Sequence, residues 1–191
     1  MNAYLVFYIM MSACLISTIT LCRVSNPLHQ TILALEVCIT AISSYMYSRF
    51  FRLNPHDISV LRYTGWVLTT PLMLLSICLL MGNWTLPTLV YLIGLDWLML
   101  LAGYLGEIQV LPRRLMALAG FLPFGLLFAT LYTMISTPFS MGIWWVYVVI
   151  WSGYGLAYLG KESLKNKLMN GLDCIAKAMV AIALSIHFWP V

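Results

Sequence analysis

The sequence predicts an all-α integral membrane protein, a bundle of seven transmembrane helices. Of its 191 residues, 62% are apolar and only 8% are charged. A soluble domain of this size cannot cover its surface with so few charges. The apolar residues also fall into seven runs, and at about 1.5 Å per residue each run is long enough to cross roughly 30 Å of hydrocarbon.

The predicted spans are separated by short segments rich in turn-forming residues, such as "SNP" at 25–27 and "LPRR" at 111–114. A β-barrel would instead show short segments of alternating hydropathy. The connections are too short to hold a catalytic domain, so we expect one transmembrane domain over residues 1–191 and no enzyme. The spans cover residues 3–22, 30–51, 57–81, 84–106, 112–135, 141–160 and 166–189.

The positive charges are distributed unevenly between the two sides of the membrane. The net charge of +4 is too small and too scattered to indicate a nucleic-acid partner. One side holds only Arg23, and the positive-inside rule therefore places the amino terminus in the cytoplasm. The cations on the side of the amino terminus are Arg49, Arg52, Arg113, Arg114, Lys161, Lys165 and Lys167.

Several ionisable residues lie well inside the predicted spans. A charge at the centre of a span costs roughly 2.5–3.5 kcal/mol on insertion scales, so each one needs a partner or a use. The remaining acidic residues lie near span ends, where water is available. The residues inside the spans are Glu36, Arg62, Asp96, Asp173 and Lys177.

Asp173 and Lys177 share one face of the last span, because they are four residues apart in "LDCIAKA". They could form an ion pair whose only role is to neutralise the two charges. Two apolar residues would fill the same space without the electrostatic cost, however. A buried lysine can also form a Schiff base with a carbonyl compound, and the resulting cation needs a nearby carboxylate.

The third span carries polar and aromatic side chains at helical spacing in "RYTGWVLTTPLMLL", residues 62–75. Arg62, Trp66, Thr69 and Thr70 recur on one face, and Pro71 lets the helix bend.

The sixth span adds an aromatic stripe in "WSGYGLAY", with Trp151, Tyr154 and Tyr158 at positions i, i+3 and i+7. Such a stripe can simply pack against lipid or the core. A flat polyene held between Trp66 and Trp151 would account for both tryptophans.

These three motifs resemble those of the microbial (type 1) rhodopsins, and the resemblance extends over all seven spans. In that family the third helix typically reads R-Y-x-D-W-x-x-T-T-P-L, the sixth W-S-x-Y-P-x-x-W or Y, and the seventh L-D-x-x-x-K. The resemblance implies a rhodopsin-like bundle with all-trans retinal bound covalently to Lys177. It also implies Asp173 as the counterion and Arg62 as a switchable cation.

The resemblance implies a retinal pocket drawn from spans three to seven. Asp96 is expected to be a protonated clamp between helices, with transport as the alternative. The pocket residues are Trp66, Thr70, Met73, Asp96, Met99, Gly103, Gly120, Phe124, Trp151, Tyr154, Tyr158 and Ala176.

The sequence departs from the outward proton pumps of the family at two positions. Those pumps carry an aspartate before Trp66, where this chain has Gly65, and their internal proton donor corresponds to Ser76. An ordinary outward proton pump is therefore not expected. With Asp173 as the single counterion, a protonated Schiff base is less stabilised. A bound anion beside Gly65 could compensate, or the base could be neutral at alkaline pH.

Glu36 is the other unusual carboxylate. The stretch "AISSYMY" at 41–47 aligns with the second helix of the family and places Glu36 in the same half of the bundle as Ser76. Some viral rhodopsins, including light-gated cation channels, have a similarly placed glutamate. Glu36 could relay a proton, as the logic of inward pumps would require, or gate a water path. It could also be a neutral acid bonded to Ser76.

We expect a light-driven or light-gated transporter of protons or small cations, with an anion possible, in a cell or host membrane. The alternatives are a sensory rhodopsin that signals to a membrane partner and a retinal-free structural bundle. The family orientation has the amino terminus outside, against the cation bias, and the opposite orientation would reverse the direction of transport. The exposed helix flanks favour a homo-oligomer. The predicted ion pathway comprises Glu36, Arg62, Gly65, Thr69 and Ser76.

Overall fold

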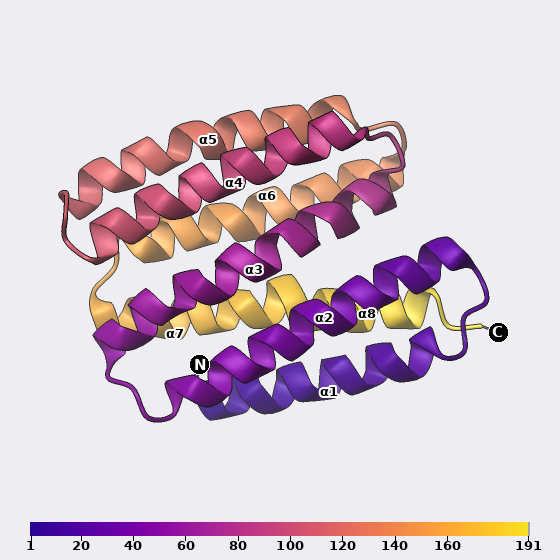
Figure 1. The fold of residues 1–191 in the computed structure, drawn as a ribbon, viewed down its shortest axis with the longest axis horizontal. Coiled ribbons are helices and arrows are strands. Elements are labelled where there is room, and N and C mark those ends of the chain that lie inside the picture. Colours follow the sequence, from indigo (N-terminus) through magenta and orange to yellow (C-terminus); the bar gives the residue numbers. More distant parts are fainter. Residues whose placement is uncertain (191) are drawn as a thin grey trace.

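The structure is a computed structural model that describes residues 1–190, and it confirms the predicted seven-helix membrane fold. Seven helices are long and apolar enough to cross a membrane, and residues 1–190 contain no strand (Figure 1). The first six are α1 (Ala3–Leu21), α2 (Pro27–Phe50), α3 (Pro55–Met81), α4 (Leu86–Glu107), α5 (Arg113–Thr133) and α6 (Pro138–Tyr158). The seventh is continuous and comprises α7 (Glu162–Asp173), η1 (Cys174–Met179) and α8 (Val180–His187).

Several helices begin earlier than hydropathy predicts, because a polar first turn can be helical when it is capped. The Asn26 side chain accepts hydrogen bonds from the backbone of the first turn of α2, and Asn54 does the same for α3. Each asparagine is followed by a proline that fits the first helical position. The seventh helix begins at Glu162 instead of 166, since the polar segment "ESLK" is helical as well.

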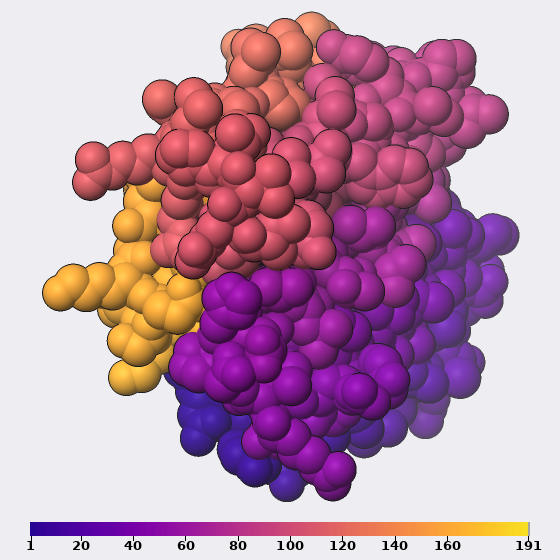
Figure 2. Space-filling model, turned by 60° about the vertical axis from the view of Figure 1, so that its left-hand side comes forward, coloured from indigo at the N-terminus to yellow at the C-terminus, as the bar shows by residue number. Residues whose placement is uncertain are grey.

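The two ends of the bundle hold different parts of the chain. The amino terminus and the turns α2–α3, α4–α5 and α6–α7 lie at one end, and the carboxyl-terminal segment lies at the other (Figure 1). We call these the N-terminal end and the C-terminal end. Figure 2 turns the N-terminal end toward the viewer, where the beginnings of α3, α5 and α7 gather.

The seventh helix contains one wide turn, which the sequence did not predict. Residues Cys174–Met179 form a π-helix, and Lys177 lies inside it. Short π-helical turns are rare and often occur at functional sites, because they change the direction of a side chain within an otherwise regular helix. The fold thus gives Lys177 a local backbone different from the rest of its helix.

Candidate functional site

Asp173 is the centre of a buried cluster of polar side chains from four helices. Its Oδ1 atom lies 2.9 Å from the Lys177 Nζ atom, and the side chain is 2% exposed. Both carboxylate oxygens also accept hydrogen bonds from the neighbouring helices. The donors are Trp66 Nε1 at 3.2 Å, Tyr154 Oη at 2.9 Å, Tyr47 Oη at 2.7 Å and Arg62 Nη1 at 2.8 Å.

The cluster contains two cations and one carboxylate. Arg62 and Lys177 both pair with Asp173, and all three side chains are at most 5% exposed. The Arg62 guanidinium lies 5.7, 5.2 and 5.9 Å from the ring centres of Tyr47, Phe50 and Trp66. Such cation–π contacts stabilise a buried cation. Arg62 also donates from Nη2 to the side-chain oxygen of Asn170 at 2.7 Å.

Beside this cluster, an apolar cavity of about 810 Å³, its open side included, reaches Lys177. Ten of the twelve side chains predicted for the pocket line it, from Trp66 and Thr70 on α3 to Trp151, Tyr154 and Tyr158 on α6. The others of the ten are Met73, Met99, Gly103, Gly120 and Phe124.

Two of the predicted pocket residues lie away from the cavity wall. Asp96 is fully buried behind Thr70, which donates a hydrogen bond to its Oδ2 atom. This contact joins α3 to α4. Ala176 packs into the apolar core and not into the cavity wall, since it points in a different direction from its helical neighbour Lys177.

The cavity is also lined by residues that the sequence reasoning missed. Gly155 belongs to the quoted motif of the sixth span, and Met169 lies two turns before Lys177 on the same helix, so their spacing could have indicated both. No local signal marked the others. The missed residues are Tyr63, Leu100, Met116, Ala117, Phe121, Gly155 and Met169.

The space beside Gly65 is filled by a methionine. A Cβ atom added to Gly65 would lie 3.0 Å from the Cγ atom of Met46 on α2. The Thr69 hydroxyl donates to the Gly65 carbonyl at 3.0 Å. The predicted pathway residues Gly65 and Thr69 thus supply no carboxylate, and the Thr69 hydroxyl donates its hydrogen within α3.

Glu36 and Ser76 meet in the half of the bundle toward the C-terminal end. The Ser76 hydroxyl donates to Glu36 Oε1 at 2.8 Å, and the glutamate is 2% exposed. Within the described residues, this is the one hydrogen bond to the Glu36 carboxyl group. The pair joins α2 to α3, and Ser76 is the partner that the neutral-acid alternative named.

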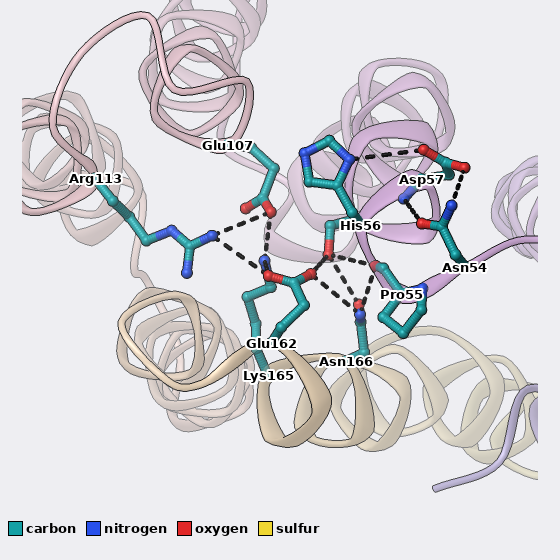
Figure 3. A network of polar contacts seen from close by, with 10 residues as sticks. Asn54, Pro55, His56, Asp57, Glu107, Arg113, Glu162, Lys165 and Asn166 are labelled. Atoms are coloured by element: carbon teal, nitrogen blue, oxygen red, sulfur yellow. Dashed lines mark hydrogen bonds and ion pairs between the residues drawn. The ribbon is translucent and has the colours of Figure 1, made fainter.

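A second polar network closes the N-terminal end of the bundle (Figure 3). Lys165 is completely buried, forms a short ion pair with Glu107, and lies 2.9 Å from Glu162. Arg113 contacts both carboxylates at 3.4 Å, and Ser59 on α3 donates to Glu162. The sequence placed Lys165 and Glu107 near water, but the four helix ends pack so tightly here that Glu107 is only 1% exposed.

The fold and the site thus define a seven-helix membrane protein with a buried, ion-paired lysine at an apolar cavity. The family model for bacteriorhodopsin-like proteins matches residues 2–185, and the chain belongs to this family. This finding confirms the family expected from the sequence motifs. A comparison with curated proteins gives no match.

Solved rhodopsin structures superimpose closely on the chain. The viral rhodopsin OLPVRII is 29% identical, with a TM-score of 0.93 over 98% of this chain and 95% of that one. The blue light-absorbing proteorhodopsin from Med12 is 20% identical (TM-score 0.85, 98% and 94% covered). The proton pumping rhodopsin AR2 from the marine alga Acetabularia acetabulum is 21% identical (TM-score 0.83, 97% and 92% covered). The last two show the shared fold alone.

Proposed function

We propose that this chain binds all-trans retinal covalently on Lys177 and transports protons across a membrane in response to light. The observation that carries the proposal is the position of the Lys177 amine, which lies at the apolar cavity and 2.9 Å from Asp173. A buried amine beside a carboxylate can condense with an aldehyde and keep the positive charge of the product paired.

The residues present fit retinal. Among the described residues, Lys177 is the only lysine that lines the cavity. The rest of the wall is mostly aromatic, methionine and glycine, which suits an apolar polyene. Trp66 and Trp151 both belong to this wall, as expected for two indoles that hold a flat chain. Bound retinal supplies a light-driven change of shape at the Lys177 nitrogen.

Asp173 and Arg62 would set the electrostatics around that nitrogen. Within residues 1–190, Asp173 is the one carboxylate in contact with Lys177, and it also pairs with Arg62 at 2.8 Å. Because Met46 fills the space beside Gly65, the geometry gives little room for a bound anion there. Gly65 and Met46 cannot take up a proton, and Asp173 is already paired with both Arg62 and Lys177. We therefore assign the role of proton acceptor to Glu36, the carboxyl group toward the C-terminal end.

The surroundings of Glu36 favour a proton over a hydrated cation as the cargo. Glu36 is held by Ser76 among buried side chains such as Ile39 and Ile77. A hydrated ion would need a continuous polar lining, whereas a proton can pass between a few hydrogen-bonded groups and transient water.

The decisive test is Lys177→Ala, with Lys167→Ala as the control because Lys167 is an exposed lysine on the same helix. We expect wild type and the control to form a visible absorption band with all-trans retinal, and Lys177→Ala to form none while remaining helical. Borohydride reduction under illumination should label the peptide that contains Lys177. A visible band in Lys177→Ala would refute the assignment.

Transport is tested in vesicles whose orientation is fixed by a terminal tag. Illumination should change the internal pH, and a protonophore should abolish the change. A light-induced current that reverses with the gradient of another cation would instead indicate a channel. A coloured protein that moves no ions would favour the sensory alternative.

A further inference from the structure

We propose that Phe121, resting on Gly155, is the entrance through which retinal passes from the bilayer to Lys177. This inference depends on the proposed retinal binding, but it concerns the route of the ligand and not its final site. It follows from three features of the cavity: which wall residue faces outward, what that residue rests on, and how the N-terminal end is closed.

Phe121 is the wall residue that faces outward. Of the described residues that line the cavity, only Phe121 is classed as exposed, with 38% of its surface accessible. Its neighbours on α5, Leu118 and Leu122, are 71% and 70% exposed and therefore face the lipid. The Phe121 ring is thus in contact with both the lipid side and the cavity, and it separates the two.

Gly155 on α6 provides the surface against which the ring lies. A Cβ atom added to Gly155 would be 2.8 Å from the Phe121 Cζ atom, so only glycine lets the ring approach this closely. The corresponding position of the family motif is proline, whose ring would need the same space. In this chain the Phe121 side chain, which can rotate, occupies the space that the rigid proline ring would need.

The Phe121 ring also contacts an aromatic neighbour on its own helix. It meets Phe124 edge to face, with ring centres 5.9 Å apart. Pro123, two residues further along α5, lacks the amide hydrogen that would bond the preceding turn, which lets the helix bend at this level. By contrast, nearer the C-terminal end the Trp144 indole donates to the Phe128 carbonyl at 2.8 Å and ties α6 to α5.

The route from the N-terminal end is closed by charged and hydrogen-bonded groups. The Tyr158 hydroxyl donates to the Gly103 carbonyl at 2.9 Å, and the Arg113 guanidinium lies 5.6 Å from the centre of the Tyr158 ring. Beyond them lies the ion network around Lys165 (Figure 3). An apolar aldehyde dissolved in lipid would have to separate buried ion pairs there, whereas at Phe121 it has to displace one aromatic ring.

The test measures how fast the visible band appears when the protein, produced without retinal and reconstituted in phosphatidylcholine vesicles, receives all-trans retinal. Phe121→Ala should load faster by on the order of tenfold, equivalent to about 1.4 kcal/mol of barrier. Leu122→Ala is the matched control, since it shortens an adjacent lipid-facing side chain that does not line the cavity. It should load at the wild-type rate. If Phe121→Ala fails to fold, Phe121→Leu should show the same direction.

Gly155→Ala tests the contact from the other helix. The added methyl group should push the Phe121 ring outward and speed loading, but it should add nothing in Phe121→Ala, where no ring is left to displace. Equal rates for wild type and Phe121→Ala, or additive effects of the two substitutions, would overturn the entrance. Absence of a visible band in wild type would refute the retinal proposal itself, so the two failures are distinguishable.

Discussion

The two halves of the bundle on either side of Lys177 differ in polarity. Toward the N-terminal end, α7 presents polar residues at intervals of three or four positions, so that they share one face. They run from the Lys165 network to Lys177 and are Glu162, Asn166, Asn170 and Asp173. Toward the C-terminal end, residues 178–184 read "AMVAIAL", without a polar side chain. The carboxyl group facing that half is Glu36, which comes from α2.

This difference in polarity suggests how the protein could move protons in one direction. Lys177 lies at the boundary between a hydrogen-bonded half and a half with one isolated acid. Within the N-terminal half, a moving charge is stabilised by the fixed dipoles and ion pairs there. A charge that enters the C-terminal half loses this stabilisation. A light-driven change at the Lys177 nitrogen would therefore act at the point where the cost of moving a charge changes most. Substitutions in each half should have different effects on stability.

The largest effect is expected at Asp173. Asp173→Asn leaves Arg62 and Lys177 buried without a countercharge, and removing one partner of a buried ion pair costs about 3–5 kcal/mol. The thermal midpoint of the protein in detergent should fall strongly. Asp57→Asn is the control, because Asp57 is exposed near the start of α3. A fall in the thermal midpoint no larger than that of the control would mean that the cluster around Asp173 does not stabilise the N-terminal half.

A smaller loss of stability is expected in the network around Lys165, at the N-terminal end of the bundle. Lys165→Met leaves Glu107 buried with only the 3.4 Å contact to Arg113, and an unsatisfied buried group costs about 1–3 kcal/mol. The double substitution Lys165→Met with Glu107→Leu should recover part of the loss, since an apolar pair can replace a buried ion pair. Lys167→Met, on the exposed side of α7, should leave the thermal midpoint unchanged.

The light-induced pH change shows whether the network around Lys165 only closes the N-terminal end or also carries protons. If the network only seals the N-terminal end, the double variant should still transport. A double variant that is as unstable as Lys165→Met alone would contradict the assignment of Lys165 and Glu107 to one ion pair.

The sequence predicted those features that depend on local spacing. The seven spans follow from hydropathy, and the positions of Asp173, Arg62 and Trp66 follow from helical periodicity and family motifs. Lys165 was missed because its burial depends on Glu107, 58 positions away, where α4 ends. Phe121 was missed because α5 is apolar on all sides over residues 115–129, so its sequence does not show which face meets the cavity. The π-helical turn at Lys177 has no proline or glycine to mark it.

The smallest effect on stability, and the sharpest effect on transport, is expected at Glu36. In Glu36→Gln the amide oxygen can still accept the Ser76 hydrogen bond, so the free energy of unfolding should change by less than the roughly 1 kcal/mol of a typical hydrogen bond. The visible band should persist, because Glu36 does not line the cavity. The light-induced pH change should be lost, since an amide cannot take up a proton in the range where a carboxylate does.

Ser76→Ala is the matched control for Glu36→Gln, because it removes the hydrogen bond that Glu36→Gln keeps and leaves the carboxyl group in place. It should lower stability slightly and keep transport. If Glu36→Gln transports at the wild-type rate, the isolated acid is only a packing element. A proton would then cross the C-terminal half through water alone, and every protein group that binds the proton would lie in the N-terminal half.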